Sequence, residues 1–251
     1  MINTQIQLQP AFILQQRKYR ETSLILELLT RDYGLIAVLA KGVLKSKSKT
    51  AALLRPFQGI LISCSGTGSL LLLNQVELAD QYKNLQGIAV YCGFYLNELV
   101  LRFLLKFDPH PEVYADYAEA LTALQGVNLT SFSKQLAYDV AESQNIERIL
   151  RYFELKLMQN IGYGLETTLE IDTGQAVRSG ARYQYHPGHG VVADAQGSVS
   201  GDTLLAIAKY DLTAPVILAE AKQLMRKVID FHLQGKILKS RLALTQIYQQ
   251  L

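Results

Sequence analysis

The sequence predicts an α+β protein, with a small all-strand domain first and a helical domain after it. Over the first eighty residues or so, apolar and polar residues alternate with the period of a strand. Beyond residue 80, apolar residues recur at helical spacing, whereas residues 166–200 follow neither period. We therefore predict a barrel domain over 1–80 and a helical domain over 81–251, interrupted by an irregular insert at about 166–200.

Five short strands are predicted in the first domain, over 9–16, 23–29, 35–40, 57–63 and 69–78. Tight turns at 32–34 (DYG) and 66–68 (GTG) separate the second strand from the third and the fourth from the fifth. Residues 43–54 alternate serine and lysine, and form either a flexible loop or a short basic helix. Five strands in about eighty residues is the number expected of a Greek-key barrel of the OB type, and a single strongly bent sheet is the alternative.

Helices are predicted over 88–107, 112–124, 132–161, 200–210, 219–234 and 240–251. Proline followed by Glu112 marks the start of the second, and Gly162 is a suitable cap after the third. The pattern of the third is interrupted near 143–145. Within the insert, we expect a hairpin that pairs 183–185 with 191–193.

The composition is that of an ordinary globular protein, with 49% hydrophobic and 19% charged residues among 251. The N-terminal residues lack the pattern of a signal peptide, and no apolar run is long enough to cross a bilayer. Cys64 and Cys92 lie in apolar surroundings, so we expect buried free thiols rather than a disulfide. These features favour a cytoplasmic protein.

Positive charge is concentrated in residues 17–55, which hold nine basic residues and three acids, although the whole chain carries only +3. Cations that neutralise phosphates and aromatic faces that stack on bases together form nucleic-acid surfaces. The candidate aromatic faces are Phe12, Tyr19, Tyr33 and Phe57. The alternative to a nucleic-acid surface is a basic hairpin that is exposed to solvent and has no binding function.

The sequence carries no recognisable motif for catalysis or metal binding. The phosphate-loop pattern and Cys-x2-Cys pairs are both absent. His186 and His189 lack a third ligand at a characteristic spacing, which favours a polar turn over a metal site. Because no nucleophile is paired with a base, we predict a binding protein that is not an enzyme and needs no metal or cofactor.

The order and spacing of several segments resemble the RecO family of bacterial recombination-mediator and DNA-repair proteins, over nearly the whole chain. The segments are 20–24 (RETSL), 31–34 (RDYG), 40–42 (AKG), 54–57 (LRPF), 95–99 (YLNEL) with Arg102, 108–112 (DPHPE), 150–155 (LRYFEL), 162–164 (GYG), 198–201 (SVSG) and 235–241 (GKILKSR). The resemblance implies an OB-fold domain, a helical domain and, in some members, a late zinc ribbon. Here Glu170 stands about where the first zinc-binding cysteine of those members falls, so the insert is expected to be a metal-free remnant.

The resemblance also implies a function in the RecF pathway, at the nucleoid. RecO-like proteins bind single- and double-stranded DNA without sequence preference and anneal complementary strands. With RecR they load RecA onto DNA coated with single-strand-binding protein, whose acidic tail they bind. The predicted phosphate contacts are Arg31, Lys41, Lys45, Lys47, Lys49 and Arg55, with Lys239 and Arg241 as a second group. Arg151 matches the family arginine expected at the tail site, and Arg148 shares that role.

Three other functions are compatible with the residues alone. An OB-type module that binds RNA would use the same cations, and a protein-only adaptor would use them to bind acidic tails. A nuclease that holds a metal with His186, His189 and Asp194 is the third.

Overall fold

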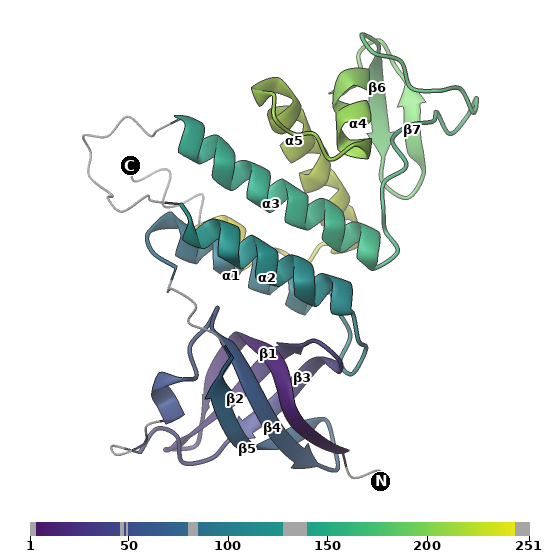
Figure 1. Ribbon diagram of the computed structural model, residues 1–251. Helices are drawn as coiled ribbons and strands as arrows, with labels where there is room; N and C mark the ends of the chain where they lie inside the picture. Colours follow the sequence, from purple (N-terminus) through teal and green to yellow (C-terminus); the bar gives the residue numbers. More distant parts are fainter. Residues whose placement is uncertain (1–3, 46–47, 49, 80–84, 128–139, 244–251) are drawn as a thin grey trace. The chain divides into compact units, whose positions relative to one another are not determined.

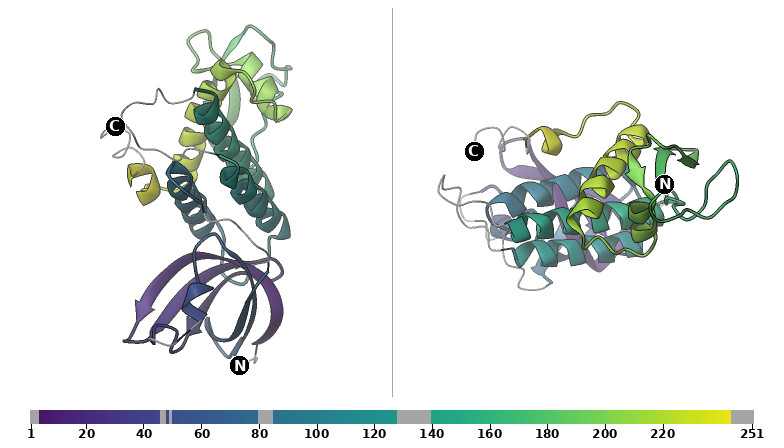
Figure 2. Two further views of the ribbon diagram at one scale, coloured as in Figure 1. Left: turned by 60° about the vertical axis from the view of Figure 1, so that its left-hand side comes forward. Right: turned by 90° about the horizontal axis from the view of Figure 1, so that it is seen from above.

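The computed structural model describes residues 4–45, 48, 50–79, 85–127 and 140–243 (Figures 1 and 2). The chain forms two compact units. The first comprises residues 1–131 together with 239–251, and the second comprises residues 132–238. The division at residue 80 inferred from the change of period stays a prediction.

The first unit contains a closed five-stranded barrel (Figure 2, left). Its strands are β1 (Thr4–Tyr19), β2 (Ser23–Thr30), β3 (Gly34–Ala40), β4 (Gly59–Gly66) and β5 (Leu70–Leu78), in the order β1-β2-β3-β5-β4. The first half of β1 pairs with β4 and its second half with β2, so this one strand joins two parts of the wall. β3 and β5 run parallel, and the other pairs are antiparallel. The five-stranded barrel is thus confirmed, and the bent sheet was wrong.

Alternation along the strands fills the barrel. The inward side chains at 0% exposure include Ile13, Leu26, Leu28, Ile36, Val38, Ile60 and Ile62. Complete burial of each such side chain contributes about 1.5–3 kcal/mol. The alternation that predicted the strands therefore also provides the core of the first unit.

Two strands differ from their predicted bounds by more than one residue, and both also continue three residues past their predicted ends, β1 to Tyr19 and β4 to Gly66. β1 begins at Thr4 rather than residue 9, because a bulge at Leu8, whose φ is 45°, interrupts the alternation within a strand that continues. β4 begins at Gly59 rather than residue 57. Phe57 instead adopts a φ of 67° and packs its ring 5.0 Å from that of Phe94. Within residues 43–54, the described part of the chain contains one short 3-10 helix, η1 (Thr50–Ala52).

Two helices pack against the barrel within the first unit, α1 (Ile88–Phe103) and α2 (Pro111–Gln125). The buried amide of Asn97 on α1 donates a hydrogen bond to the carbonyl oxygen of Leu14 on β1 at 2.7 Å. Its oxygen accepts one from the Tyr117 hydroxyl on α2 at 2.5 Å. The ring of Phe12 lies 5.1 Å from that of Tyr117. One buried polar side chain thus joins β1, α1 and α2.

The segment between α1 and α2 is bound to the start of β3. The Phe107 amide donates to the Leu35 carbonyl oxygen at 2.9 Å, and Lys106 forms a parallel bridge with Leu35. This attachment explains why α1 ends at Phe103, earlier than the predicted residue 107. The approach is so close that a Cβ placed on Gly34 would lie 2.0 Å from the Asp108 carbonyl oxygen.

Gly34→Ala is therefore expected to destabilise the first unit. Gly34 has a φ of +64°, which costs an alanine about 1–2 kcal/mol, and the added methyl group meets backbone that must move. We expect a loss of at least about 2 kcal/mol of unfolding free energy, measured by urea denaturation. Gly68→Ala is the matched control, because a Cβ there meets nothing within 4 Å. Equal stability of the two variants would contradict the prediction.

The second unit combines helices with a small sheet (Figure 1). Its elements are α3 (Val140–Asn160), β6 (Arg182–His186), β7 (Gly190–Ala193), β8 (Val199–Ser200), α4 (Gly201–Ala208) and α5 (Pro215–His232), with the strands in the order β7-β6-β8. Tyr183 pairs with Ala193 and Tyr185 with Val191, which confirms the predicted hairpin. The Ser200 side chain caps α4 by accepting a hydrogen bond from the Thr203 amide.

The predicted interruption of the third helix at 143–145 was wrong, since α3 continues through these residues. Ser143, Gln144 and Asn145 are half-buried or exposed, so their polarity marks one face of an amphipathic helix rather than a break. The earlier part of that predicted helix, 132–139, lies outside the described residues. Of the last predicted helix, 240–251, residues 240–243 are described and helical.

Two sequence expectations concern burial. Cys64 and Cys92 are buried free thiols, as predicted, and burial raises the pKa of Cys64 to about 11. None of the helices within the described ranges is long and apolar enough to traverse a bilayer.

Candidate nucleic-acid interface

One end of the barrel carries a cluster of exposed cations. The turn between β1 and β2 contacts the segment that follows β3, through a hydrogen bond from the Leu44 amide to the Thr22 carbonyl oxygen at 2.9 Å. A second bond runs from the Gly42 amide to the Ser23 hydroxyl at 3.3 Å. These contacts bring two basic segments together. We name the result the basic end, which consists of Arg17, Lys18, Arg20, Lys41 and Lys45.

The strand register explains why these cations gather. Leu24 at the start of β2 is paired on one side with Lys18 of β1 and on the other with Ala40 of β3. The end of β1 and the end of β3 therefore flank the same residue. Arg20, with a φ of 53°, turns the chain here, and its guanidinium carbon lies 5.3 Å from the centre of the Tyr19 ring.

The charge of the basic end is open to solvent. All five side chains are exposed, and in the ranges that the structure describes none of them forms an ion pair with an acid. Glu21 is the acid in the same turn, so the cluster keeps a clear positive excess. Cations without acid partners attract phosphates more strongly than cations that are already paired.

Other predicted contacts lie elsewhere on the barrel. Arg31 follows β2, at the end of the β2–β3 hairpin opposite Lys41, and the seven residues of β3 separate the two by about 20 Å. Its guanidinium pairs with Asp32 at 2.9 Å, and this contact raises the pKa of Arg31 and lowers that of Asp32. Arg55 is exposed beyond η1. Lys47 and Lys49 lie outside the described residues.

The second predicted group, Lys239 and Arg241, belongs to the same unit as the barrel. The Glu98 carboxylate on α1 accepts hydrogen bonds from the Lys239 amide at 3.0 Å and from the Ser240 amide at 2.8 Å. Burial would raise the pKa of Glu98, but these bonds, the Ser240 hydroxyl and nearby Arg102 lower it. The Glu98 carboxylate thus fixes the start of this basic segment on α1.

The two arginines predicted to bind a partner differ in exposure. Arg151 is buried at 6%, where it pairs with Glu147 at 3.4 Å and with Glu154, another buried residue. Arg148 is half-buried and donates from Nε to the Leu212 carbonyl oxygen at 3.3 Å. Neither is a freely exposed arginine on a helix surface, and their role in partner binding stays a prediction.

Two of the aromatic side chains expected to stack on bases are not available. Phe12 is 1% exposed between β1 and the helices, and Phe57 is 9% exposed against Phe94. Their role as base platforms was wrong, because both rings belong to the core of the first unit. Tyr19 and Tyr33 remain at the surface, at opposite ends of β1–β3.

The sequence-based set of contacts omitted Arg17, Lys18 and Arg20, which the structure places beside Lys41 and Lys45. They belong to the basic stretch 17–55, but the first strand was predicted to end at residue 16, so the predicted strands did not place them beside Lys41. The useful signal was the run of four polar residues, 15–18, at the end of an otherwise apolar strand. Such a run indicates a strand that extends past the core, with both faces in solvent.

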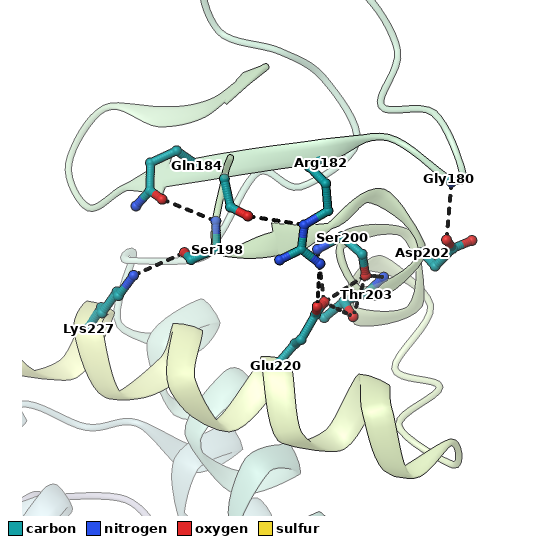
Figure 3. A network of polar contacts seen from close by, with 10 residues as sticks. Gly180, Arg182, Gln184, Ser198, Ser200, Asp202, Thr203, Glu220 and Lys227 are labelled. Atoms are coloured by element: carbon teal, nitrogen blue, oxygen red, sulfur yellow. Dashed lines mark hydrogen bonds and ion pairs between the residues drawn. The ribbon is translucent and has the colours of Figure 1, made fainter. Parts of the chain in front are cut away.

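The insert of the second unit is held by a carboxylate (Figure 3). Glu220 on α5 accepts hydrogen bonds from the Ser200 amide and hydroxyl at 2.8 and 2.6 Å, the Thr203 hydroxyl at 2.7 Å and Arg182 at 2.6 Å. Burial alone would raise the pKa of Glu220, but these donors lower it to about 2. β6, β8 and α4 are thereby bound to α5.

Glu220 is expected to make the second unit sensitive to acid. Its pKa is lowered in the folded state from 4.5, so its contribution to stability is present above about pH 4.5 and is lost as the pH falls toward 2. Because the carboxylate keeps some contact with solvent, we expect that contribution to be about 1–2 kcal/mol. Thermal unfolding is measured at pH 7, 4 and 3, and the melting temperature of Glu220→Gln should fall less with decreasing pH than that of the parent chain. If the melting temperatures of the two proteins fall in parallel, Glu220 does not have this role.

No cluster suited to a metal is present in the part of the chain that the structure describes, where three or more His, Cys, Asp or Glu side chains never converge. His189 instead contacts Asp172 at 3.3 Å, and the rings of His186 and His189 lie 6.4 Å apart. Glu170 is buried and accepts a hydrogen bond from the Thr173 hydroxyl at 3.0 Å.

A closed five-stranded barrel with cations around the loops at one end is typical of OB-fold proteins that bind nucleic acids. Comparison with known proteins specifies the family. Residues 4–82 match the family model described as Recombination protein O N terminal, and residues 85–242 match Recombination protein O C terminal. The chain belongs to the RecO family of DNA repair and recombination proteins.

Individual members of the family are similar to this chain over nearly its full length. The chain is 40% identical to the DNA repair protein RecO of Methylococcus capsulatus over 240 residues, which cover 95% of this chain and 93% of the relative. It is 38% identical to the protein of the same name from Polynucleobacter necessarius subsp. necessarius, covering 93% of both chains. It is also 38% identical to that of Nitrosococcus oceani, covering 93% of this chain and 91% of the relative.

Proposed function

We propose that this chain binds single- and double-stranded DNA through the basic end of its barrel, without sequence preference. The observation that carries the proposal is the set of five exposed cations that lack acid partners among the described residues. Lysine and arginine side chains in solvent neutralise phosphates, which are the same in every sequence. Arg55 and the group at Lys239 and Arg241 are further candidate phosphate contacts within the same unit.

We further propose that the chain anneals complementary strands and acts as a recombination mediator rather than an enzyme. Annealing needs no chemical step, because cations that screen two polyanions lower their repulsion and let base pairing proceed. Membership of the RecO family supports a role with RecR in loading RecA onto DNA coated with single-strand-binding protein. Such a role places the protein at the nucleoid.

The acidic tail of single-strand-binding protein is the proposed partner of the second unit. Arg148 is the candidate for direct contact, because its half-buried guanidinium can reach a carboxylate at the surface. Arg151 is buried between Glu147 and Glu154, so we assign it a positioning role that keeps α3 in place.

The test is annealing of two complementary oligonucleotides, bare and precoated with single-strand-binding protein, by the parent chain and by Arg148→Ala. The parent chain should anneal both substrates, and the variant should fail only on the coated one. Matched DNA and RNA oligonucleotides are titrated in parallel. Equal or stronger binding of RNA would favour the RNA-binding alternative, and an absence of binding to both would favour the adaptor.

A further inference from the structure

The exposed face of α5 in the second unit combines cations with an aromatic ring. Residues four apart lie in line on a helix, so Gln223, Lys227 and Phe231 form one row and Lys222, Arg226 and Asp230 form the next. The three cations are exposed, and Phe231 is 53% exposed. Three cations against one acid give these two rows a positive excess.

Further rings continue the row past the end of α5. Tyr163, which is 48% exposed, stacks on His232 with ring centres 4.2 Å apart and an angle of 20°. Phe231 meets His232 edge to face at 5.1 Å. At the tip of the β6–β7 hairpin, a Cβ on Gly188 would lie 3.0 Å from the Phe231 ring. Flat rings are thus gathered where the cation row ends.

The opposite face of α5 is buried, and this packing fixes the position of the exposed cations and of Phe231. Leu224, Met225, Val228 and Ile229 are buried, and α5 lies alongside α3 in the second unit (Figure 1). Among the described residues, the partners of these cations lie at the surface, and Lys227 donates a hydrogen bond to the Ser198 hydroxyl at 3.0 Å. Lys222 pairs with Glu147 at 2.7 Å and Arg226 with Asp230 at 4.0 Å, and these four side chains keep contact with solvent. Exposed pairs contribute about 0–1 kcal/mol, so phosphates can replace the acids.

We propose that this face of α5 is a second binding surface for single-stranded nucleic acid. Lys222, Arg226 and Lys227 contact phosphates, and Phe231 with Tyr163 stacks on unpaired bases. Lys227 and Phe231 are four residues apart, about 6 Å along the helix, so a nucleotide can place its phosphate on one and its base on the other. Stacking accepts any base, which matches binding without sequence preference.

This inference rests on the proposed function and deepens it. Annealing brings two strands to one protein, and the two surfaces lie on different units, the basic end on the first and this face on the second. Each unit then holds one strand, and base pairing joins them.

The experiment uses the full chain and a photoreactive oligothymidine. In the parent chain we expect crosslinks, mapped by mass spectrometry, at Phe231 or Tyr163 as well as near the basic end. Phe231→Ala should remove its own crosslink and slow annealing about tenfold. Arg226→Glu/Lys227→Glu should slow annealing. It should also lower the slope of log K against log salt by about 0.7 for each phosphate that the protein no longer neutralises.

Two control variants lie outside the two rows: Val216 is near the start of α5, about 22 Å along the helix axis from Phe231, and Lys209 ends α4. Val216→Ala removes an exposed apolar side chain, and Lys209→Glu reverses an exposed cation that precedes α5. Both should anneal as the parent does. Crosslinks confined to the first unit, with unchanged annealing by the α5 variants, would overturn the inference while leaving the proposed function intact. The inference would also be overturned if the α5 variants lost binding to an acidic tail peptide while their affinity for DNA stayed unchanged. A parent chain that binds no DNA would instead refute the proposed function.

Discussion

Lys41→Glu/Lys45→Glu is expected to weaken binding of single-stranded DNA by about 10- to 100-fold at physiological salt. Two cations that face solvent, with no acid partner among the described residues, become two acids beside the phosphate backbone. The slope of log K against log salt should fall by about 0.7 for each phosphate left without its cation, and affinity should drop equally for every sequence. Fluorescence anisotropy over a salt series measures both quantities.

Two further variants decide whether the basic end is the surface concerned. Glu21→Lys adds a cation to the same turn and should tighten binding severalfold. Arg31→Glu lies about 20 Å away, beyond the screening length of about 8 Å, and should change affinity little. Equal losses for Arg31→Glu and the lysine pair would show that DNA follows the whole hairpin instead. An unchanged affinity of the lysine variant would exclude the basic end as the binding surface.

Arg151→Leu should cost the second unit about 3–5 kcal/mol of unfolding free energy. The substitution removes a buried cation from beside Glu154, whose side chain is 1% exposed, and from Glu147. A buried carboxylate that loses its cation is strongly destabilising. Urea denaturation followed by circular dichroism measures the loss.

The matched control is Arg148→Leu, three residues earlier on α3, which loses a hydrogen bond to one carbonyl group and should cost about 1 kcal/mol. Arg151→Leu/Glu154→Leu should recover much of the stability, because the buried charge is removed with its partner. If Arg151→Leu is as stable as the parent yet fails to bind the tail peptide, the arginine contacts the partner directly and the positioning role is wrong.

The barrel was predictable because each of its strands carries its own signal. Alternating apolar residues mark the inward face, and the Asp32-Tyr33-Gly34 turn separates β2 from β3 with Gly34 at positive φ. The same applies to the hairpin of the insert. The sequence did not predict the boundary of an element where contacts with residues distant in the chain determine it. α1 stops at Phe103 because Leu35, far away in the chain, binds Phe107.

The candidate interface was predictable only in part, for a related reason. Composition identifies a basic stretch but does not say at which end of a strand each side chain lies. Arg31 and Lys41 are ten residues apart, yet β3 takes them to opposite ends of the barrel, while Lys18 joins Lys41 through strand pairing. The burial of Arg151 was also hidden, because its acidic partners one turn before and after it resemble an ordinary surface pattern.

The bonds from Lys239 and Ser240 to Glu98 bear on how the protein is assembled during translation. The first unit is discontinuous, since residues 132–238 are inserted between α2 and the segment that Glu98 holds. A nascent chain can close its barrel early, but α1 acquires these bonds only after the entire second unit has left the ribosome. A fragment cut after residue 131 would therefore carry the barrel with a half-buried Glu98 carboxylate that keeps Arg102 nearby but lacks the donors of Lys239 and Ser240.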